Sequence, residues 1–182
     1  MKIAPELIKA LRKLGVQKAY PKKFTLVDEG EVSKFTYFVE EGCVRLWYNN
    51  DGKDVSVKFF LPGEICASLE SFFHETPSKY VLDTITPCIL RRITKAEADA
   101  AAADTPELLS YFTSVMVHCM ADYQDLFVDR IGNSPEERYR ALIEQDPDVH
   151  EIVPLHYIAS YLGVTSVSLS RIRKKIRLLN KR

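Results

Sequence analysis

Five side chains on one short helix near the C-terminus have the chemistry to contact another molecule. Ser166, Val167, Ser170, Arg171 and Lys174 share one face of a predicted helix, while leucine and isoleucine side chains occupy the opposite face at spacings of three and four. Hydroxyl and guanidinium groups donate hydrogen bonds to phosphates, and an arginine can contact both acceptors of a guanine. These residue types in this pattern indicate a nucleic-acid-binding surface.

The residues before this helix are suited to position it. Ile158, Ala159 and Leu162 give the preceding helix one apolar stripe. Gly163 accepts the positive φ of a sharp turn, and the hydroxyl of Thr165 can cap the next helix. This spacing is typical of a helix-turn-helix, which lays its second helix in the major groove of DNA. The predicted DNA contacts are Thr165, Ser166, Val167, Ser168, Ser170, Arg171, Lys174 and Lys175.

The distribution of charge supports this prediction. The chain has 25 basic and 25 acidic residues, so its formal net charge is zero. Residues 152–182 hold seven basic residues and no acidic one, which leaves residues 1–151 with 18 basic and 25 acidic residues, a net charge of −7. A basic end can release counterions from a phosphate backbone. A helical hairpin with a solvated basic face is the alternative, and it explains the charge but not the patterned turn.

Length and composition fit a folded protein of one large domain or two smaller ones. The chain has 182 residues, of which 46% are hydrophobic, enough for a substantial core. Residues 1–15 have the pattern of a charged amphipathic helix rather than of a signal peptide, and the uncharged run 108–121 is too short to span a bilayer. The four cysteines are widely spaced, which favours reduced thiols over disulfides or zinc. We expect a soluble, cytoplasmic protein with no membrane partner.

Residues 21–94 have the pattern of consecutive short strands, rich in β-branched and aromatic residues. Gly30, Gly42 and Pro62-Gly63 mark turns between them, and residues 49–52, Asn-Asn-Asp-Gly, are a strong hairpin signal. Short strands at even spacing predict a sandwich or a jelly-roll barrel. The predicted strands are residues 24–27, 35–39, 44–48, 55–60, 80–84 and 89–93.

The order of these turns and strands resembles a known architecture. Residues 28–31, 37–45, 51–52 and 61–64 follow the order of the cyclic-nucleotide-binding β-roll of the Crp/Fnr transcription regulators. With the helix-turn-helix, the resemblance covers nearly the whole chain. It implies an α+β fold with an N-terminal double-stranded β-helix or jelly roll, a long dimerisation helix and a C-terminal, winged-helix-like helix-turn-helix.

The resemblance also implies three parts. Residues 1–104 form the cyclic-nucleotide-binding-like sensor, residues 105–132 the dimerisation helix and hinge, and residues 133–182 the DNA-binding domain. In the last part we predict a capped helix over residues 135–145 and a short strand at residues 151–153. The sequence stops soon after the last helix, so we expect the wing to be short or absent.

Two positions of the expected nucleotide pocket depart from the family pattern. Cyclic-nucleotide-binding members carry a Gly-Glu pair, whose Glu binds the ribose hydroxyl, and an Arg-Ser pair, whose Arg neutralises the phosphate. The matching residues here are Ala67-Ser68 and Ser78-Lys79. A buried phosphate without a cation would be costly, and neighbouring residues on a strand point to opposite faces. We expect no cofactor and no tight binding of cyclic AMP or cyclic GMP. Either another effector occupies this candidate pocket, or its residues are ordinary loop residues.

A long helix from residue 105 to residue 131 carries apolar residues at alternating steps of three and four. This is a coiled-coil seam of less than three heptads. In the Crp/Fnr family this helix pairs with its two-fold mate, so the resemblance implies a homodimer. A second stripe, with Leu108, Val115 and Phe127, can pack on the β-roll. The predicted seam residues are Leu109, Phe112, Met116, Cys119, Tyr123 and Leu126.

These inferences predict a homodimeric transcription regulator that binds double-stranded DNA. RNA polymerase and an unidentified small-molecule effector are further partners that the family implies. Many family members carry Arg and Glu where this chain has Ser166 and Val167, which puts their usual G·C-rich half-site in doubt; Val167 suits a thymine methyl group. An effector-sensing or protein-interaction module with weak or no specific DNA binding is the alternative.

An enzyme of the metal-dependent cupin type is a further possibility for a small β-roll. Such an enzyme needs histidine and carboxylate ligands clustered on inward-facing strand positions. Only His74 lies in the predicted β region. We therefore predict no enzymatic activity and no metal site.

Overall fold

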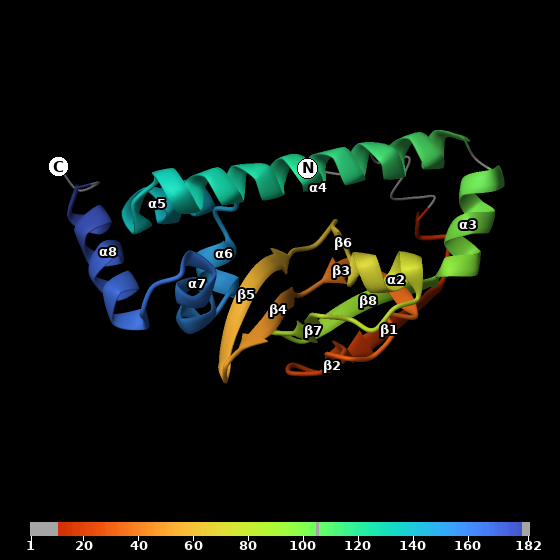
Figure 1. Cartoon of the computed structure of the whole chain (residues 1–182), viewed down its shortest axis with the longest axis horizontal. Helices are drawn as coiled ribbons and strands as arrows, with labels where there is room; N and C mark the ends of the chain where they lie inside the picture. Colours follow the sequence, from red (N-terminus) through yellow and green to blue (C-terminus); the bar gives the residue numbers. More distant parts are fainter. Residues whose placement is uncertain (1–10, 105, 180–182) are drawn as a thin grey trace.

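The computed structural model describes residues 11–104 and 106–179, which form a β-roll, a long helix beside it and a group of short helices at one end (Figure 1). Two four-stranded antiparallel sheets make the roll, in the orders β1-β8-β3-β6 and β2-β7-β4-β5. The strands are β1 (Val16–Tyr20), β2 (Thr25–Val27), β3 (Phe35–Glu41), β4 (Val44–Asn50), β5 (Lys53–Phe60), β6 (Ile65–Cys66), β7 (Val81–Thr84) and β8 (Cys88–Thr94).

The helices lie around the roll and at one end of it. The long helix α4 runs beside the roll from α3 at one end to α5–α8 at the other (Figure 1). No helix in the described ranges is long and apolar enough to cross a membrane. The helices are α2 (Leu69–His74), α3 (Lys95–Asp104), α4 (Pro106–Gly132), α5 (Pro135–Gln145), α6 (Val149–Ile152), α7 (Leu155–Leu162) and α8 (Ser166–Leu179).

The interior of the roll forms because alternate strand residues are apolar and point inward. Val39, Val44, Leu82 and Leu90, from four different strands, are fully buried in one cluster. All six predicted strands are present, each within two residues of its predicted ends. The sequence prediction missed β1, whose first four residues are exposed and show no apolar alternation, and β6, which has only two residues.

The connection after α4 matches the sequence prediction at α5 and departs from it further on. The Glu137 N–H donates to the Ser134 hydroxyl and the Ser134 N–H donates to the Glu137 carboxylate, which is the predicted cap of α5. The prediction of a strand at residues 151–153 is wrong, because Val149–Ile152 form the helical turn α6. The Val153 N–H donates to the Val149 carbonyl at 2.8 Å, so local hydrogen bonds replace those of a strand.

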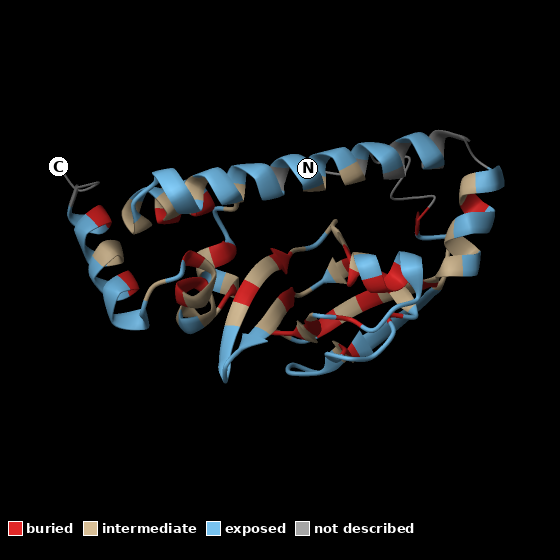
Figure 2. Ribbon diagram, viewed as in Figure 1, coloured by how far each residue is buried: buried red, intermediate tan, exposed pale blue. Residues whose placement is uncertain are grey.

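One apolar core joins the roll to the last helices. Phe59 and Ile85 of the roll belong to the same buried cluster as Ile158 of α7 and Leu169 of α8. In Figure 2, buried positions occur on α7, α8 and β5, whereas α4 is exposed along most of its length. The cluster crosses the boundary predicted at residue 132, and the division into three parts stays a prediction.

We predict that the β3–β4 turn requires glycine more strictly than the β4–β5 turn. Gly42 and Gly52 both have positive φ, but a Cβ at Gly42 would lie 2.3 Å from the Pro87 carbonyl oxygen, whereas nothing lies within 4 Å of one at Gly52. Gly52→Ala should lower the free energy of unfolding by about 1–2 kcal/mol through its φ alone. Gly42→Ala should lower it by about 2–5 kcal/mol, because overpacking is added. Urea denaturation measures both values, and equal values would contradict the described packing.

Candidate functional site

The α7–α8 unit, residues 155–179, has the two helices and the tight turn that the sequence predicts. Gly163 ends α7 with a φ of 67°, and the Val164 N–H donates to the Ala159 carbonyl at 2.9 Å. The Ser168 N–H donates to the Thr165 hydroxyl at 3.1 Å, which caps α8 as expected. These hydrogen bonds fix the direction in which α8 leaves the turn.

Helix α8 has one face in the core and one face in solvent. Leu169 and Ile176 are buried, and Ile172 is half-buried against the same cluster. Val167 is 62% exposed although its side chain is apolar. The solvent face therefore combines hydroxyl, guanidinium and ammonium groups with the apolar side chains of Val167 and Leu178. All the predicted DNA-contacting residues are exposed: Thr165, Ser166, Val167, Ser168, Ser170, Arg171, Lys174 and Lys175.

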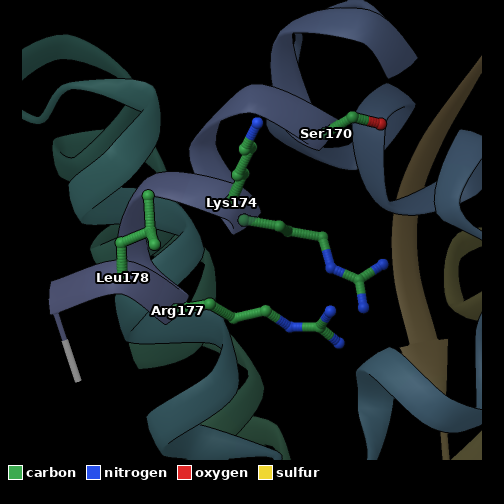
Figure 3. Close-up of a pocket in the computed structure, with 5 residues that line it drawn as sticks. Ser170, Lys174, Arg177 and Leu178 are labelled. Carbon is green, nitrogen blue, oxygen red and sulfur yellow. The ribbon is translucent and has the colours of Figure 1, made fainter. Parts of the chain in front are cut away.

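An open cleft of about 460 Å³ lies along α8, and its lining is basic (Figure 3). Ser170, Arg173, Lys174, Arg177 and Leu178 line it, with Ser170, Lys174 and Arg177 on successive turns of the helix. Three cationic side chains in one cleft attract a phosphate backbone. Arg173 was not among the predicted contacts, although its charge contributes to the basic C-terminal segment.

Lys175 differs from Lys174 because another helix holds its ammonium group. Lys175 Nζ lies 2.6 Å from Glu136 Oε2 of α5, and Arg140 lies 3.2 Å from the other oxygen of the same carboxylate. The hydrogen bonds from Lys175 and Arg140 lower the pKa of Glu136. Lys175 therefore links α8 to α5, whereas Lys174 lines the cleft.

Two arginines that the sequence prediction missed hold the C-terminal end of α7. Arg130 of α4 donates to the Tyr161 carbonyl at 2.8 Å, and Arg138 of α5 donates to the Leu162 carbonyl at 3.0 Å. The last carbonyl groups of a helix lack partners within the helix, so a guanidinium there satisfies them and complements the helix dipole. The α7–α8 unit is thereby tied to the long helix.

In the roll, two residues of the candidate effector pocket contact each other. Ser68 and Ser78 are 2% and 4% exposed, and their hydroxyl oxygens lie 2.8 Å apart. The Ser78 hydroxyl also lies 2.6 Å from the Tyr80 carbonyl oxygen. These polar atoms satisfy one another inside the protein, as buried polar groups generally do.

The other two candidate pocket residues add no charge to the interior. Ala67 is buried, and Lys79 is exposed, with its ammonium 3.0 Å from the carboxylate of Glu70. Lys79 therefore does not supply a buried cation at the position where the family carries arginine. This placement agrees with the expectation that Lys79 points away from Ser78.

The exposed apolar side chains of α4 form a broad face along the helix. Spacings of three, four and seven link the members near its centre, as in a helix that packs against a second helix. The exposed large apolar residues are Leu109, Val117, Met120, Tyr123, Phe127, Val128 and Ile131.

This face differs from the predicted seam by a rotation of α4. Leu109 and Tyr123 are exposed as predicted, Met116 and Cys119 are half-buried, and the Phe112 side chain lies outside the described part of the structure. Leu126 instead lines a small cleft with residues of α5 and α7. The suggestion that Phe127 packs on the roll is wrong, because that side chain is 67% exposed. Met120 and Phe127 thus lie where Cys119 and Leu126 were expected.

The cysteines have the character that the sequence predicts. Cys43, Cys66 and Cys88 are buried, Cys119 is half-buried, and none of these four forms a disulfide within the described residues. Burial raises the pKa of Cys43, Cys66 and Cys88, so these thiols stay protonated. Within the described ranges, no three His, Cys, Asp or Glu side chains lie close enough together to hold a metal ion.

Residues 17–104 match the family model of the cyclic nucleotide-binding domain. The solved structure of FixK2 from Bradyrhizobium japonicum is similar, with a TM-score of 0.79 and 16% identity over 92% of this chain and 86% of FixK2. The regulator CLP from Xanthomonas campestris, described as c-di-GMP responsive, has a TM-score of 0.72 and 16% identity over 97% of this chain and 93% of CLP.

The catabolite activator protein of Thermus thermophilus is also similar, with a TM-score of 0.58 and 19% identity over 98% of this chain and 85% of that protein. No curated protein sequence matches the chain. These matches confirm the expected fold.

We predict that the roll does not bind cyclic AMP or cyclic GMP at micromolar concentration. The pair Ser68–Ser78 is buried without a carboxylate for the ribose or a cation for the phosphate, and burying the phosphate charge unpaired would be costly. Calorimetric titration of the full chain with each nucleotide should give no saturable heat, while a cyclic-AMP-binding control protein does. Saturable binding would show that the pair opens and that another cation reaches the phosphate.

Proposed function

We propose that this chain is a transcription regulator of the Crp/Fnr type and acts as a homodimer that binds a two-fold DNA site through α8; the match to the cyclic nucleotide-binding domain and the likeness to FixK2 support the proposal. The observation that carries the proposal is the solvent face of α8, which is basic, rich in hydroxyl groups and free of acidic residues. Helices of this kind read the major groove, and dimers present two of them about one helical turn of DNA apart.

The electrostatic part of binding comes from the basic cleft. Arg173, Lys174 and Arg177 line it, and each phosphate that they neutralise releases a counterion. The affinity for any duplex should therefore fall steeply as salt rises. Lys175 should contribute less to this electrostatic attraction than these three residues, because its ammonium group is already paired with Glu136.

Sequence discrimination comes from the residues near the start of α8. Arg171 is exposed and can bridge the O6 and N7 acceptors of a guanine, while the exposed Val167 suits a thymine methyl group. Ser166, Ser168 and Ser170 suit phosphate oxygens. We propose a half-site with one essential G·C pair beside an A·T pair, rather than a uniformly G·C-rich one.

The proposed dimer interface is the exposed face of α4. Met120, Tyr123 and Phe127 lie at steps of three and four, which is the spacing of a helix that pairs with a second copy. A two-fold axis along α4 would give both protomers the same contact and match the two-fold symmetry of the DNA site. We retain the three-part division at residues 104 and 132 as part of this proposal.

For the β-roll we propose a sensor role without naming its effector. We propose that the roll binds an effector other than a cyclic nucleotide, or none, and the buried hydrogen bond between Ser68 and Ser78 supports this. RNA polymerase contact and a cytoplasmic location accompany the proposal as family expectations. The competing function, a sensor or protein-interaction module without specific DNA binding, predicts no preference among duplex sequences even at low salt.

The first experiment maps the DNA sites bound by the full chain and then measures the affinity for one site against mixed duplex DNA at several salt concentrations. Arg171→Ala should weaken specific binding by about 1–3 kcal/mol because one base contact is lost. Arg171→Lys keeps the charge but not the bidentate geometry, so it should weaken specific binding and leave mixed-DNA affinity unchanged. Wild-type protein with no sequence preference would favour the competing function.

The second experiment tests the dimer. Phe127→Glu places a charge in the proposed apolar interface, so we expect dimerisation to weaken about tenfold or more in sedimentation analysis. Phe73→Glu is the matched control, since Phe73 is a half-exposed phenylalanine on α2, outside that face. A Phe127→Glu protein that remains as dimeric as the control would contradict the proposed interface.

A further inference from the structure

Arg45 of β4 is a buried cation on the outer face of the β2-β7-β4-β5 sheet. Its side chain is only 2% exposed, and its Nε and Nη2 donate to the two oxygens of Asp83 at 3.1 and 3.0 Å. Asp54 at the β4–β5 hairpin adds a second carboxylate at 3.5 Å. A cation this deeply buried needs such partners, and the bidentate geometry fixes the plane of the guanidinium.

The Arg45 guanidinium contacts aromatic rings of both the roll and the α7–α8 unit. Its guanidinium carbon lies 3.9 Å from the ring centroid of Tyr157, which belongs to α7, and 4.7 Å from that of Trp47 on β4. Cation–π contacts strengthen when they are removed from water, as here. Arg45 therefore links the β2-β7-β4-β5 sheet, here called the sensor sheet, to α7, the first helix of the α7–α8 unit.

Ser160 of α7 makes a second link at the edge of the same sheet. β5 is the edge strand in the order β2-β7-β4-β5. The Ser56 N–H donates to the Ser160 hydroxyl at 2.9 Å, and that hydroxyl donates to the Asp54 carbonyl at 2.6 Å. One side chain thus satisfies two of the backbone groups at this edge with which a further strand would pair.

Helix α7 is held from its other end as well. Arg130 and Arg138 bind the Tyr161 and Leu162 carbonyls, so the same short helix is fixed both to the sensor sheet and to the long helix. Only the turn at Gly163 separates α7 from α8. The position of α7 therefore sets the position of the exposed face of α8.

We infer that Arg45 and Ser160 are positioning residues for DNA binding. They hold α7 on the sensor sheet and thereby fix the angle and separation at which a dimer presents its two α8 helices. The inference rests on the proposed function. It predicts that loss of these contacts leaves each α8 able to bind one half-site but abolishes the preference for one half-site spacing.

The test uses the full chain with the double variant Tyr157→Ala, Ser160→Ala. Both changes lie on α7 and leave the Arg45–Asp83 pair of the roll intact. Arg45→Met is the second variant, and Arg92→Met is its matched control, because Arg92 also lies over an aromatic ring, that of Phe35 at 5.1 Å, but belongs to β8 in the other sheet. Circular dichroism checks that each variant is folded.

Two readouts report the contact itself without DNA. Hydrogen exchange at the Ser56 amide should become about tenfold faster or more in the double variant, since its acceptor is gone. Trp47 is the single tryptophan of the chain, so the emission and acrylamide quenching of the whole protein report the Arg45 stack. Both variants should change Trp47 emission, and Arg92→Met should not.

The decisive readout compares duplexes with one half-site and with two half-sites, whose spacing is changed by about 5 base pairs, half a helical turn. Wild type should prefer one spacing about tenfold or more, because both helices then bind at once. Both variants should lose that preference and keep wild-type affinity for the single half-site. Variants that lose the Trp47 signal but keep the spacing preference would overturn the inference, as would unchanged Ser56 exchange in the double variant. Wild type that binds no duplex would instead overturn the proposed function, and the positioning role with it.

Discussion

The structure depends on the way in which α7 is held between two parts of the molecule. Its apolar side, with Ile158, Ala159 and Leu162, is buried in a cluster that also contains roll residues. Hydrophobic burial is not directional, so this cluster alone would allow α7 to rotate or slide. The polar contacts of Arg45, Ser160, Arg130 and Arg138 supply the direction, because hydrogen bonds and stacked rings have narrow geometry. Stability and orientation therefore come from different interactions at one helix.

Local sequence patterns were sufficient for the parts of the fold that local forces determine. The six alternating strands, the Ser134–Glu137 cap and the Gly163 turn depend on residues within a few positions of one another. The opposite faces of α8 follow from helical periodicity for the same reason. The α7–α8 unit could accordingly be predicted almost to the residue, whereas the hydrogen bond between Ser68 and Ser78 was not predicted, because it joins two segments of the roll that are ten residues apart.

The features that sequence reasoning missed depend on distant parts of the chain. Nothing near Arg45 indicates that Tyr157 will cover it, and nothing near Ser160 indicates an edge strand about a hundred residues earlier. Ile152 and Val153 have the β-branched side chains of a strand, yet residues 149–152 form a helical turn that Val153 ends, and its own hydrogen bonds satisfy the backbone. The exposed apolar face of α4 differs from the predicted seam by a rotation, because Leu126 lines a cleft with α5 and α7 while Phe127 is exposed, and the seam itself stays a prediction. In each case tertiary contacts outweigh the local signal.

The Ser160 hydroxyl, which binds backbone groups at the edge of β5, also protects that edge from pairing with another chain. An exposed edge strand has unpaired amide and carbonyl groups. A strand of another chain can pair with them, which is a common route to aggregation. With α7 seated, Ser160 occupies those groups at Ser56 and Asp54. If α7 left the sheet, the Ser56 amide and the Asp54 carbonyl would lose these hydrogen bonds and the edge of β5 would be open there. The contact of α7 with the sheet therefore also limits aggregation through the edge of β5.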